Sequence, residues 1–224
     1  MIEVYGSPVS NCYNTVLAAL CHKQVEYRER HVSASMDSEF RHNSPMGKIP
    51  FITHGQLALS ETSAILEYLD EVFPGSALFP GTAELRGRQR QLMKFVELYV
   101  ESPSRRLFPG VFWAGSNEPL HVREVRPVIE RGMDAVQILL EDHPKILELS
   151  SSAAAYYLYL SLSLVGVVTR QQYQWELTTH YPLVRTLLSK TASLPDIITI
   201  CAQRDAAMQA YLDRKAAAAK ARTD

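Results

Sequence analysis

Two helix-breaking clusters, Phe73-Pro74-Gly75 and Phe79-Pro80-Gly81, divide the chain into parts with different sequence patterns. Before them, short β-prone runs alternate with runs at helical spacing; after them, nearly every run has helical spacing. This change of pattern is incompatible with one continuous sheet or one uniform bundle. A chain of 224 residues is long enough for two domains. We therefore predict an α/β domain over residues 1–76, a linker over 77–84 and an all-α domain over 85–224.

The start of the chain predicts a strand–helix–strand unit. Residues 2–5 alternate and are β-prone, residues 11–23 carry apolar side chains at helical spacing, and residues 25–32 form the second expected strand. The expected inward-facing anchors of that second strand are Val25, Tyr27 and Val32.

The rest of the first domain predicts a loop with an irregular helix over residues 33–45, then two strands joined by the turn His54-Gly55-Gln56. Ser60 is the expected N-cap of the following helix. In the second domain, one expected helix face is formed by Leu85, Leu92, Val96 and Tyr99. Further helices are expected over residues 118–142, 150–169, 182–190 and 195–218.

Composition and charge exclude several classes of protein. The net charge is −1 and the sequence pI about 6.7, with no basic patch, so no nucleic-acid partner is expected. The three cysteines lack CxxC spacing and Met1–Tyr5 indicates a strand rather than a signal peptide, which predicts a cytoplasmic protein. Residues 150–169 are uncharged and about as long as a membrane span, but their serines and tyrosines favour a buried helix, so no membrane association is expected. No metal site is predicted from the spacing of His54, His121, His143 and His180.

Three motifs follow one another in the predicted α/β domain. Gly6-Ser7-Pro8-Val9-Ser10 precedes the first helix, Gly47-Lys48-Ile49-Pro50 precedes a strand, and Ser60-Glu61-Thr62-Ser63 opens the third helix. With these spacings, and followed by a Pro/Gly linker and helices, they resemble the cytosolic glutathione transferases over essentially the whole chain. The match is to the superfamily, with some similarity to the serine-type theta, phi and zeta classes. It implies a thioredoxin-like N-terminal domain, a helical C-terminal domain and a homodimer.

The resemblance assigns a glutathione-binding role to five of these residues. Pro50 is implied to follow a cis peptide bond, which leaves the N–H and C=O of Ile49 free for the cysteinyl backbone of the peptide. Glu61 and Thr62, at a helix N-terminus, are implied to hold the γ-glutamyl group, and Lys48 the glycine carboxylate. The alternatives are a trans proline that starts an edge strand, plain N-capping, and a solvated lysine.

Ser10 is the candidate catalytic residue, because it matches the serine of the theta, phi and zeta classes. A serine there donates a hydrogen bond to the glutathione sulfur, and the helix N-terminus adds positive potential; both favour the nucleophilic thiolate. The alternative is that Ser10 only caps the helix. Tyr5 matches a strand position and is the weaker candidate for this role.

Cys12 lies close to Ser10, and Ser10-Asn11-Cys12 is similar to the Ser-Ser-Cys of the zeta class, which includes maleylacetoacetate isomerase. Many serine-type members carry an arginine shortly afterwards, where this chain has Asn14 and Thr15. Cys12 has three open interpretations: a small buried hydrophobic residue, a neighbour of the sulfur, or a redox partner.

In the second domain, the resemblance predicts a serine-capped central buried helix. Here Ser152-Ala153-Ala154-Ala155 retains the serine but lacks the usual aspartate, so the reciprocal contact of a capping box is lost. The resemblance also implies a second-substrate site lined by the first helices of this domain. The aromatic candidates suit an apolar electrophile and the arginines an anionic one, or several are core or dimer contacts; they are Tyr99, Arg105, Arg106, Phe108, Phe112 and Trp113.

The resulting hypothesis is a glutathione transferase that activates the glutathione thiol for attack on a small electrophile. Glutathione is then a co-substrate, and no metal is needed. One alternative is a glutathione-dependent isomerase, similar to maleylacetoacetate isomerase, or a disulfide reductase. Another is a non-catalytic interaction protein of the same fold.

Overall fold

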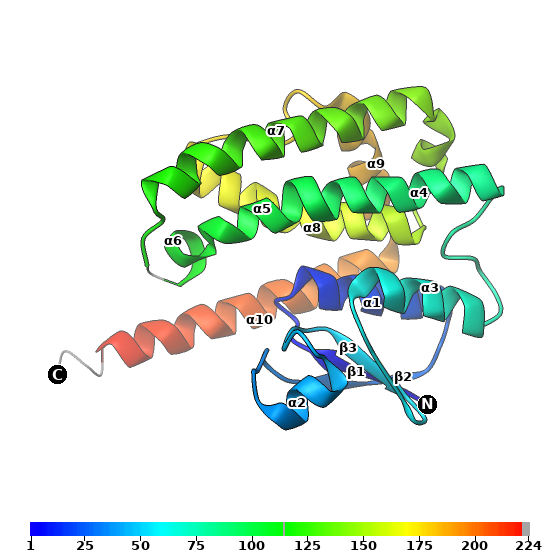
Figure 1. Ribbon diagram of the computed structural model, residues 1–224, viewed down its shortest axis with the longest axis horizontal. Helices are drawn as coiled ribbons and strands as arrows, with labels where there is room; N and C mark the ends of the chain where they lie inside the picture. The colour runs from blue at the N-terminus through cyan, green and yellow to red at the C-terminus, as the bar shows by residue number, and fades with distance from the viewer. Residues whose placement is uncertain (114, 221–224) are drawn as a thin grey trace. The chain divides into compact units, whose positions relative to one another are not determined.

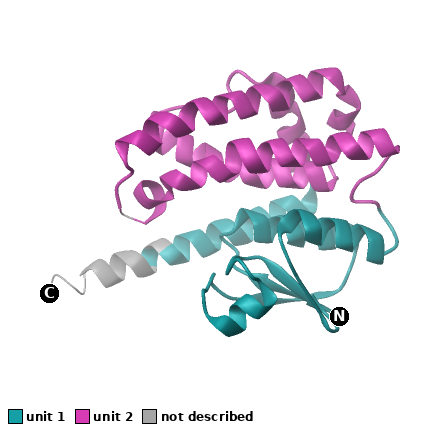
Figure 2. Cartoon of the chain, in the orientation of Figure 1, with its two compact units in different colours: residues 1–76, 194–224 teal, residues 77–193 magenta. Residues whose placement is uncertain are grey.

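The computed structural model describes residues 1–113 and 115–220, and it divides the chain into two compact units. The first unit comprises residues 1–76 and 194–224, and the second residues 77–193 (Figure 2). We predicted residues 85–224 as one helical domain. In the structure the last helix, α10 (Pro195–Lys220), contacts the first helix, α1 (Asn11–His22), and these contacts group it with the first unit.

The first unit contains a four-stranded mixed sheet (Figure 1). Its strand order is β2-β1-β3-β4, with β1 parallel to β2 and antiparallel to β3, and β3 antiparallel to β4. The elements besides α1 and α10 are β1 (Ile2–Gly6), β2 (Tyr27–His31), α2 (Ser38–Asn43), β3 (Phe51–His54), β4 (Leu57–Ser60) and α3 (Thr62–Val72). The predicted α/β architecture of this part is therefore confirmed.

The core of the first unit follows the alternation of β1. Ile2 and Val4 are buried and Glu3 and Tyr5 are half-buried, as expected when successive side chains point to opposite faces of a sheet. Helices α1 and α3 pack against each other and bury their apolar stripes. The stripes consist of Val16, Leu17 and Leu20 on α1 and Ile65, Leu66 and Leu69 on α3.

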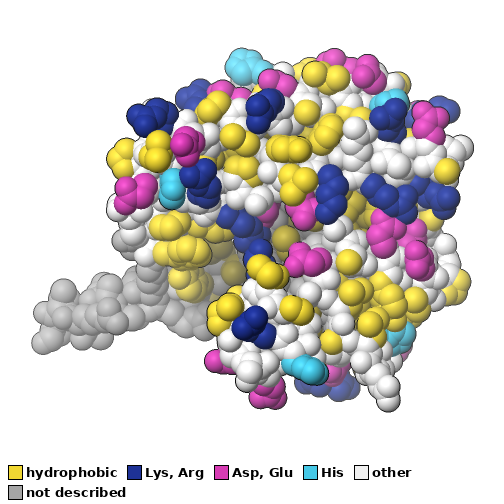
Figure 3. Space-filling view, in the orientation of Figure 1, with side chains coloured by type: hydrophobic (Ala, Val, Ile, Leu, Met, Phe, Trp, Pro, Cys, Tyr) yellow, Lys and Arg dark blue, Asp and Glu magenta, His cyan; other side chains and the backbone are white. Residues whose placement is uncertain are grey.

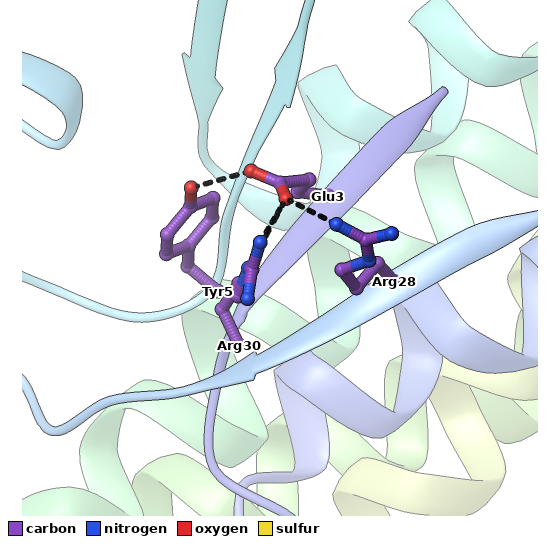
Figure 4. A network of polar contacts seen from close by, with 4 residues as sticks. All are labelled: Glu3, Tyr5, Arg28 and Arg30. Atoms are coloured by element: carbon purple, nitrogen blue, oxygen red, sulfur yellow. Dashed lines mark hydrogen bonds and ion pairs between the residues drawn. The ribbon is translucent and has the colours of Figure 1, made fainter.

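Strand β2 forms as predicted, and its three expected inward anchors are the least exposed residues of this segment, although none is fully buried. Val25, Tyr27 and Val32 are only half-buried, and the four residues after Tyr27 are exposed. The reason is that β2 is an edge strand, and its charged side chains suit an exposed edge. Two of them, Arg28 and Arg30, pair with Glu3 of β1 (Figure 4).

Among its described residues, the second unit contains helices and connecting loops but no strand. Its principal helices are α4 (Ala83–Val96), α7 (Pro119–Asp142), α8 (Ala153–Tyr173) and α9 (Pro182–Ala192). Short elements join them: η1 (Glu97–Glu101), α5 (Ser102–Ser104), η2 (Arg105–Leu107), α6 (Phe108–Phe112) and η3 (Pro144–Glu148). Side chains of both charges are interspersed over the face of the molecule drawn in Figure 3, in keeping with the net charge of −1.

Helix α8 is the central helix of the second unit and contacts α4, α9 and α6. Among the described residues it is the one helix long and apolar enough to cross a membrane, and 72% of its most apolar window is buried. The predicted buried helix is thus found. Two backbone amides of its first turn have hydrogen-bond partners outside the helix ladder. The Ala155 amide donates to the Ser152 hydroxyl at 3.3 Å, and the Ala153 amide donates to the Leu78 carbonyl at 2.9 Å. The Leu78 carbonyl gives this helix end a second partner in the absence of the aspartate.

The element η1 is a π-helix, and it changes which residues face the core. Leu92, Val96 and Val100 are fully buried, whereas Tyr99 is 43% exposed, so Tyr99 does not share the face that we predicted. A π-helix closes its hydrogen bonds over five residues rather than four. The wider turn moves Tyr99 away from the face of Leu92 and Val96, on which Val100 lies.

Candidate functional site

The three sequence motifs meet at one edge of the sheet. Phe51 of β3 is paired with Tyr5 of β1 on one side and with Ser60 of β4 on the other. The residues that follow Tyr5, precede Phe51 and follow Ser60 therefore leave the sheet at the same edge. These are Gly6–Ser10, Lys48–Pro50 and Glu61–Thr62. Helices α1 and α3 both begin at this edge, so two helix N-termini, which favour anions, lie beside the motifs.

Ser10 is the N-cap of α1 and is half-buried. Its amide donates to the Ser7 carbonyl at 2.9 Å, and its Oγ accepts from the Tyr13 amide at 3.3 Å. The capping role is therefore present. A hydroxyl that accepts one hydrogen bond still has its own hydrogen to donate, so capping and donation to a sulfur are compatible. Donation to a sulfur stays a prediction.

The side chain of Asn14 supports the turn that precedes α1. Its side chain is buried, and its Nδ2 donates to the Pro8 carbonyl at 2.8 Å. The sequence identified Asn14 only as a residue where relatives have arginine. Its position one helical turn after Ser10, on the same helix face, is the signal that it supports the turn.

Tyr5 is oriented differently from a thiol activator. Its hydroxyl donates to Glu3 at 2.8 Å (Figure 4). Its ring stacks on Phe51, with centroids 4.4 Å apart. Burial, followed by the hydrogen bond to Glu3, raises the pKa of Tyr5. The phenol therefore stays protonated at neutral pH and bound to Glu3.

The segment before β3 is held by Ser44, which the sequence did not single out, and by Gly47 of the second motif. The buried Ser44 hydroxyl donates to the Lys48 carbonyl at 2.8 Å. Gly47 has a φ of +66°, and a Cβ there would lie 2.5 Å from the Ser35 carbonyl oxygen. The Ile49–Pro50 peptide bond is cis, as the resemblance implies. Pro50 is buried, Ile49 half-buried and Lys48 exposed.

The start of α3 differs by one residue from the prediction. Ser60 is paired with Phe51 in β4, so Glu61 rather than Ser60 is the N-cap, and no side chain caps this helix. Glu61 is exposed and has φ +70° and ψ 116°, a backbone conformation that non-glycine residues rarely adopt. Thr62 is buried at the first helical position. Strained residues of this kind are concentrated at functional sites.

All three cysteines are thiols rather than disulfides, and all are half-buried. Cys12 lies in the first turn of α1, two residues after Ser10, and its three interpretations stay open. Burial raises the pKa of the Cys21 thiol, which lies 3.7 Å from the Tyr27 hydroxyl. Among the residues that the structure describes, no group of three or more His, Cys, Asp or Glu side chains is arranged to hold a metal ion.

Part of the predicted second-substrate set forms a cluster in the second unit. Phe112 and Trp113 both pack edge-on against Phe108, with centroids 5.0 and 6.1 Å away. Arg105 lies over the Phe108 ring at 5.4 Å and is bound by the buried Glu101 carboxylate. These four side chains are therefore close together.

Two of the predicted second-substrate residues, Arg106 and Tyr99, contact residues outside this aromatic cluster. Arg106 forms an exposed ion pair with Glu124 at 3.1 Å. Tyr99 is turned outward by the π-helix and neighbours Phe95, at 6.3 Å between ring centroids. A shallow depression lined by Met1, Val25, Glu26, Tyr27 and Arg28 lies at the opposite end of β1 and β2 and contains none of the candidate residues.

Known proteins resemble this chain in sequence and in fold. Residues 4–77 match the family described as glutathione S-transferase, N-terminal domain. A glutathione S-transferase of Pseudomonas putida is 28% identical over 213 residues, which cover 95% of this chain and 97% of that protein. A probable maleylacetoacetate isomerase of Vibrio cholerae is 35% identical over 103 residues, covering 43% of this chain and 46% of that protein. The crystal structure of a maleylacetoacetate isomerase from Methylobacterium extorquens, with malonate and glutathione bound, has a TM-score of 0.71 at 21% identity, covering 90% of this chain and 97% of that one.

The four-stranded sheet, the cis peptide bond before Pro50 and the helical unit that follows define the glutathione transferase fold. Residues 4–77 match the N-terminal domain family of the glutathione S-transferases, and over nearly its whole length the chain is similar to a glutathione S-transferase in sequence and to that superfamily in fold.

Proposed function

We propose that the chain binds glutathione at the sheet edge formed by the three motifs and activates its thiol for attack on a small electrophile. The observation that carries this proposal is the pairing of Phe51 with both Tyr5 and Ser60, because it places all three motifs at one edge. The relatives named as glutathione S-transferases support it.

The motifs contact different parts of the peptide, and the second motif contacts two of them. The backbone of Ile49 pairs with the cysteinyl residue, and the N-terminus of α3, with Glu61 and Thr62, takes the γ-glutamyl group. Lys48, which is exposed, takes the glycine carboxylate. These contacts place the sulfur near the N-terminus of α1, where Ser10 donates its hydroxyl hydrogen to the sulfur.

The chemistry is nucleophilic attack by a stabilised thiolate. A hydrogen bond to a charged acceptor contributes about 1.5–3 kcal/mol, equivalent to lowering the thiol pKa by roughly one to two units. The thiol proton passes to solvent, and the sulfur electron pair forms the new S–C bond. In a substitution, the leaving group departs with its bonding electrons. Phe108, Phe112 and Trp113 supply an aromatic surface for the second substrate, and Arg105 a cation beside it.

A second candidate function is glutathione-dependent isomerisation of a maleyl-type substrate. The likeness to isomerases of Vibrio cholerae and Methylobacterium extorquens favours it. In that reaction the thiolate adds to a double bond, the resulting single bond rotates, and the thiolate leaves again, so glutathione is not consumed. The cytoplasmic location and the homodimer that we expect from the superfamily belong to the same proposal.

The decisive experiment measures glutathione binding by calorimetry and thiolate formation by ultraviolet absorbance across a pH series. Ser10→Ala is the test, and Ser152→Ala is the matched control, because both serines cap a helix by accepting an amide hydrogen bond at 3.3 Å. Both variants lose about 1 kcal/mol of stability. Only Ser10→Ala is expected to raise the pKa of the bound thiol.

Turnover separates the two candidate functions. Conjugation of a halogenated aromatic compound supports transferase activity, and conversion of a maleyl compound without loss of glutathione supports isomerase activity. Reduction of a glutathione mixed disulfide would indicate a reductase. If the wild-type chain does not bind glutathione, the enzyme proposal is wrong and the interaction-protein alternative takes its place.

A further inference from the structure

Two hydrogen bonds hold the turn that presents Ser10: one lies within the turn, and the other comes from a side chain of α1. Within the turn, the Ser10 amide donates to the Ser7 carbonyl at 2.9 Å. From the helix, Asn14 Nδ2 donates to the Pro8 carbonyl at 2.8 Å. The Pro8 carbonyl takes no part in the Ser7–Ser10 bond, so Asn14 restrains a peptide group that the turn itself leaves unrestrained.

Asn14 is also joined to Ser10 through the backbone. The Asn14 amide donates to the Ser10 carbonyl at 3.0 Å, the first bond of α1 that Ser10 accepts. Asn14 therefore contacts the chain on both sides of Ser10: the Pro8 carbonyl before it through the side chain, and the Ser10 carbonyl through the main chain. Asn14 is only 2% exposed, so the donor of this hydrogen bond is shielded from water.

The hydroxyl of Ser10 is held less firmly by its own cap bond. The Tyr13 amide reaches Ser10 Oγ at 3.3 Å, longer than the usual N–H···O distance. The position of the Ser10 backbone is therefore the main determinant of where Oγ lies. Upstream, the Tyr13 ring occupies the place that a Cβ on Gly6 would need, which fixes the entry to the same turn.

We propose that Asn14 is a positioning residue that sets the direction of the Ser10 hydroxyl toward the glutathione sulfur; this rests on the function proposed above. Stabilisation of a developing or bound anion depends on a donor fixed at the correct distance before the anion arrives. Displacing a reacting group by about 1 Å can lower a rate by about two orders of magnitude. Release of the Pro8 carbonyl lets the turn relax and moves the donor.

The test compares two substitutions in the same turn of α1. Asn14→Leu keeps the size of the side chain and removes the donor to Pro8. Thr15→Val is the matched control: Thr15 is fully buried, and its hydroxyl donates to the Asn11 carbonyl at 2.9 Å within the helix. Both variants lose one hydrogen bond from a buried side chain to a backbone carbonyl, but only Asn14→Leu releases the Pro8 carbonyl.

The readouts are the pKa of the bound glutathione thiol, from its thiolate absorbance, and the separate values of kcat and KM. For Asn14→Leu we expect a rise of about one unit in the thiol pKa, and hence about tenfold less thiolate and about tenfold lower kcat at a pH well below that pKa. We expect KM for glutathione to change by less than about threefold, because the peptide-holding groups are elsewhere. Thr15→Val should leave all three values close to wild type.

Two further variants separate the possible failures. Asn14→Ala replaces Asn14→Leu if the leucine variant does not fold. An unchanged thiol pKa in the Asn14 variant, an equal shift in Thr15→Val, or a loss of binding in place of a loss of kcat overturns the positioning role. Ser10→Ala is measured alongside. If Ser10→Ala raises the thiol pKa and Asn14 variants do not, only this inference is wrong; if Ser10→Ala has no effect, the role proposed for Ser10 is wrong and this inference with it.

Discussion

Lys23 Nζ lies 3.0 Å from Asp70 Oδ1 and 3.2 Å from the Ser76 carbonyl oxygen, and the Lys23 side chain is only 2% exposed. Lys23 is the C-cap of α1, and Asp70 lies in the last turn of α3. The ion pair therefore joins the ends of the two helices that are farthest from the candidate site. Because α1 and α3 both begin at that site, their relative position there depends in part on this distant contact.

We expect the two partners of this ion pair to be unequal in their effect on stability. Lys23→Met keeps the aliphatic stem and leaves Asp70, whose side chain is 19% exposed, able to reach water; the cost is about 1–3 kcal/mol. Asp70→Ala leaves an ammonium group that is almost fully buried, and should cost about 3 kcal/mol or more. Urea unfolding of both variants measures the difference. A larger loss in Lys23→Met than in Asp70→Ala would contradict this account.

Gly132 makes room for the π-helix, and its substitution should be costly. A Cβ on Gly132 would lie 2.7 Å from the Tyr99 carbonyl oxygen and 2.8 Å from Val100 Cγ2. Because one of these atoms belongs to the backbone, Gly132→Ala should destabilise the protein by about 1–3 kcal/mol. Gly87→Ala is the matched control: it also lies inside a helix, a Cβ there would meet no other atom within 4 Å, and it should gain about 0.5–1 kcal/mol. Thermal unfolding of the two variants should therefore shift in opposite directions.

The contact between η1 and α7 shows why some features of the fold are predictable from the sequence and others are not. Helical spacing and the Pro/Gly clusters depend on neighbouring residues, so the sheet and the long helices followed from the sequence. The π-helix depends on a glycine in a different helix, α7, and no local pattern in Glu97–Glu101 indicates it. Tyr99 was consequently assigned to the wrong side of its helix.

The candidate site shows the same division. The motif residues were found because they leave their strands at recognisable turns, and strand register then brings them together. The N-cap of α3 was misplaced because Ser60, a good capping residue, is used for pairing with Phe51. The restraints supplied by Asn14 and Ser44 were not predicted, since each is a side chain bonded to a backbone carbonyl whose position only the folded turn defines.

Replacement of Glu61 by glycine should maintain or raise the stability of the fold and weaken glutathione binding. A non-glycine residue at φ +70° and ψ 116° carries a backbone strain of about 1–3 kcal/mol, which glycine does not. We expect Glu61→Gly to match or exceed wild-type stability by up to about 1 kcal/mol, because relief of strain outweighs the greater entropy of the unfolded chain. Glu61→Ala, which removes the same carboxylate but keeps the strain, should not be stabilised. Both variants should bind glutathione more weakly by calorimetry, and equal stability of the two would show that the backbone is unstrained.

Glu3 should give the fold an acid-dependent contribution to stability. The Tyr5 hydroxyl, and then Arg30, donate hydrogen bonds to its carboxylate and lower its pKa from 4.5 (Figure 4). The folded state therefore favours the ionised form, and the contribution is fully present above pH 4.5 and is lost as the pH falls through the lowered folded pKa. The stability difference between wild type and Glu3→Gln, measured by urea unfolding, should be constant near neutral pH and shrink below pH 4.5.

Tyr5→Phe separates the two causes of this effect. It removes the largest influence on the Glu3 pKa and leaves the ion pair with Arg30, in which Arg30 Nη2 lies 2.6 Å from Glu3 Oε1. The pH dependence that survives in Tyr5→Phe is then mainly electrostatic and should weaken as salt is added, because Arg30 is 45% exposed and its charge is screened. The part lost in Tyr5→Phe is a hydrogen bond between adjacent side chains and should be largely insensitive to salt. A difference between wild type and Glu3→Gln that grows on acidification would mean that Glu3 is held in its protonated form, which is the opposite of the charge arrangement found on this face of the sheet.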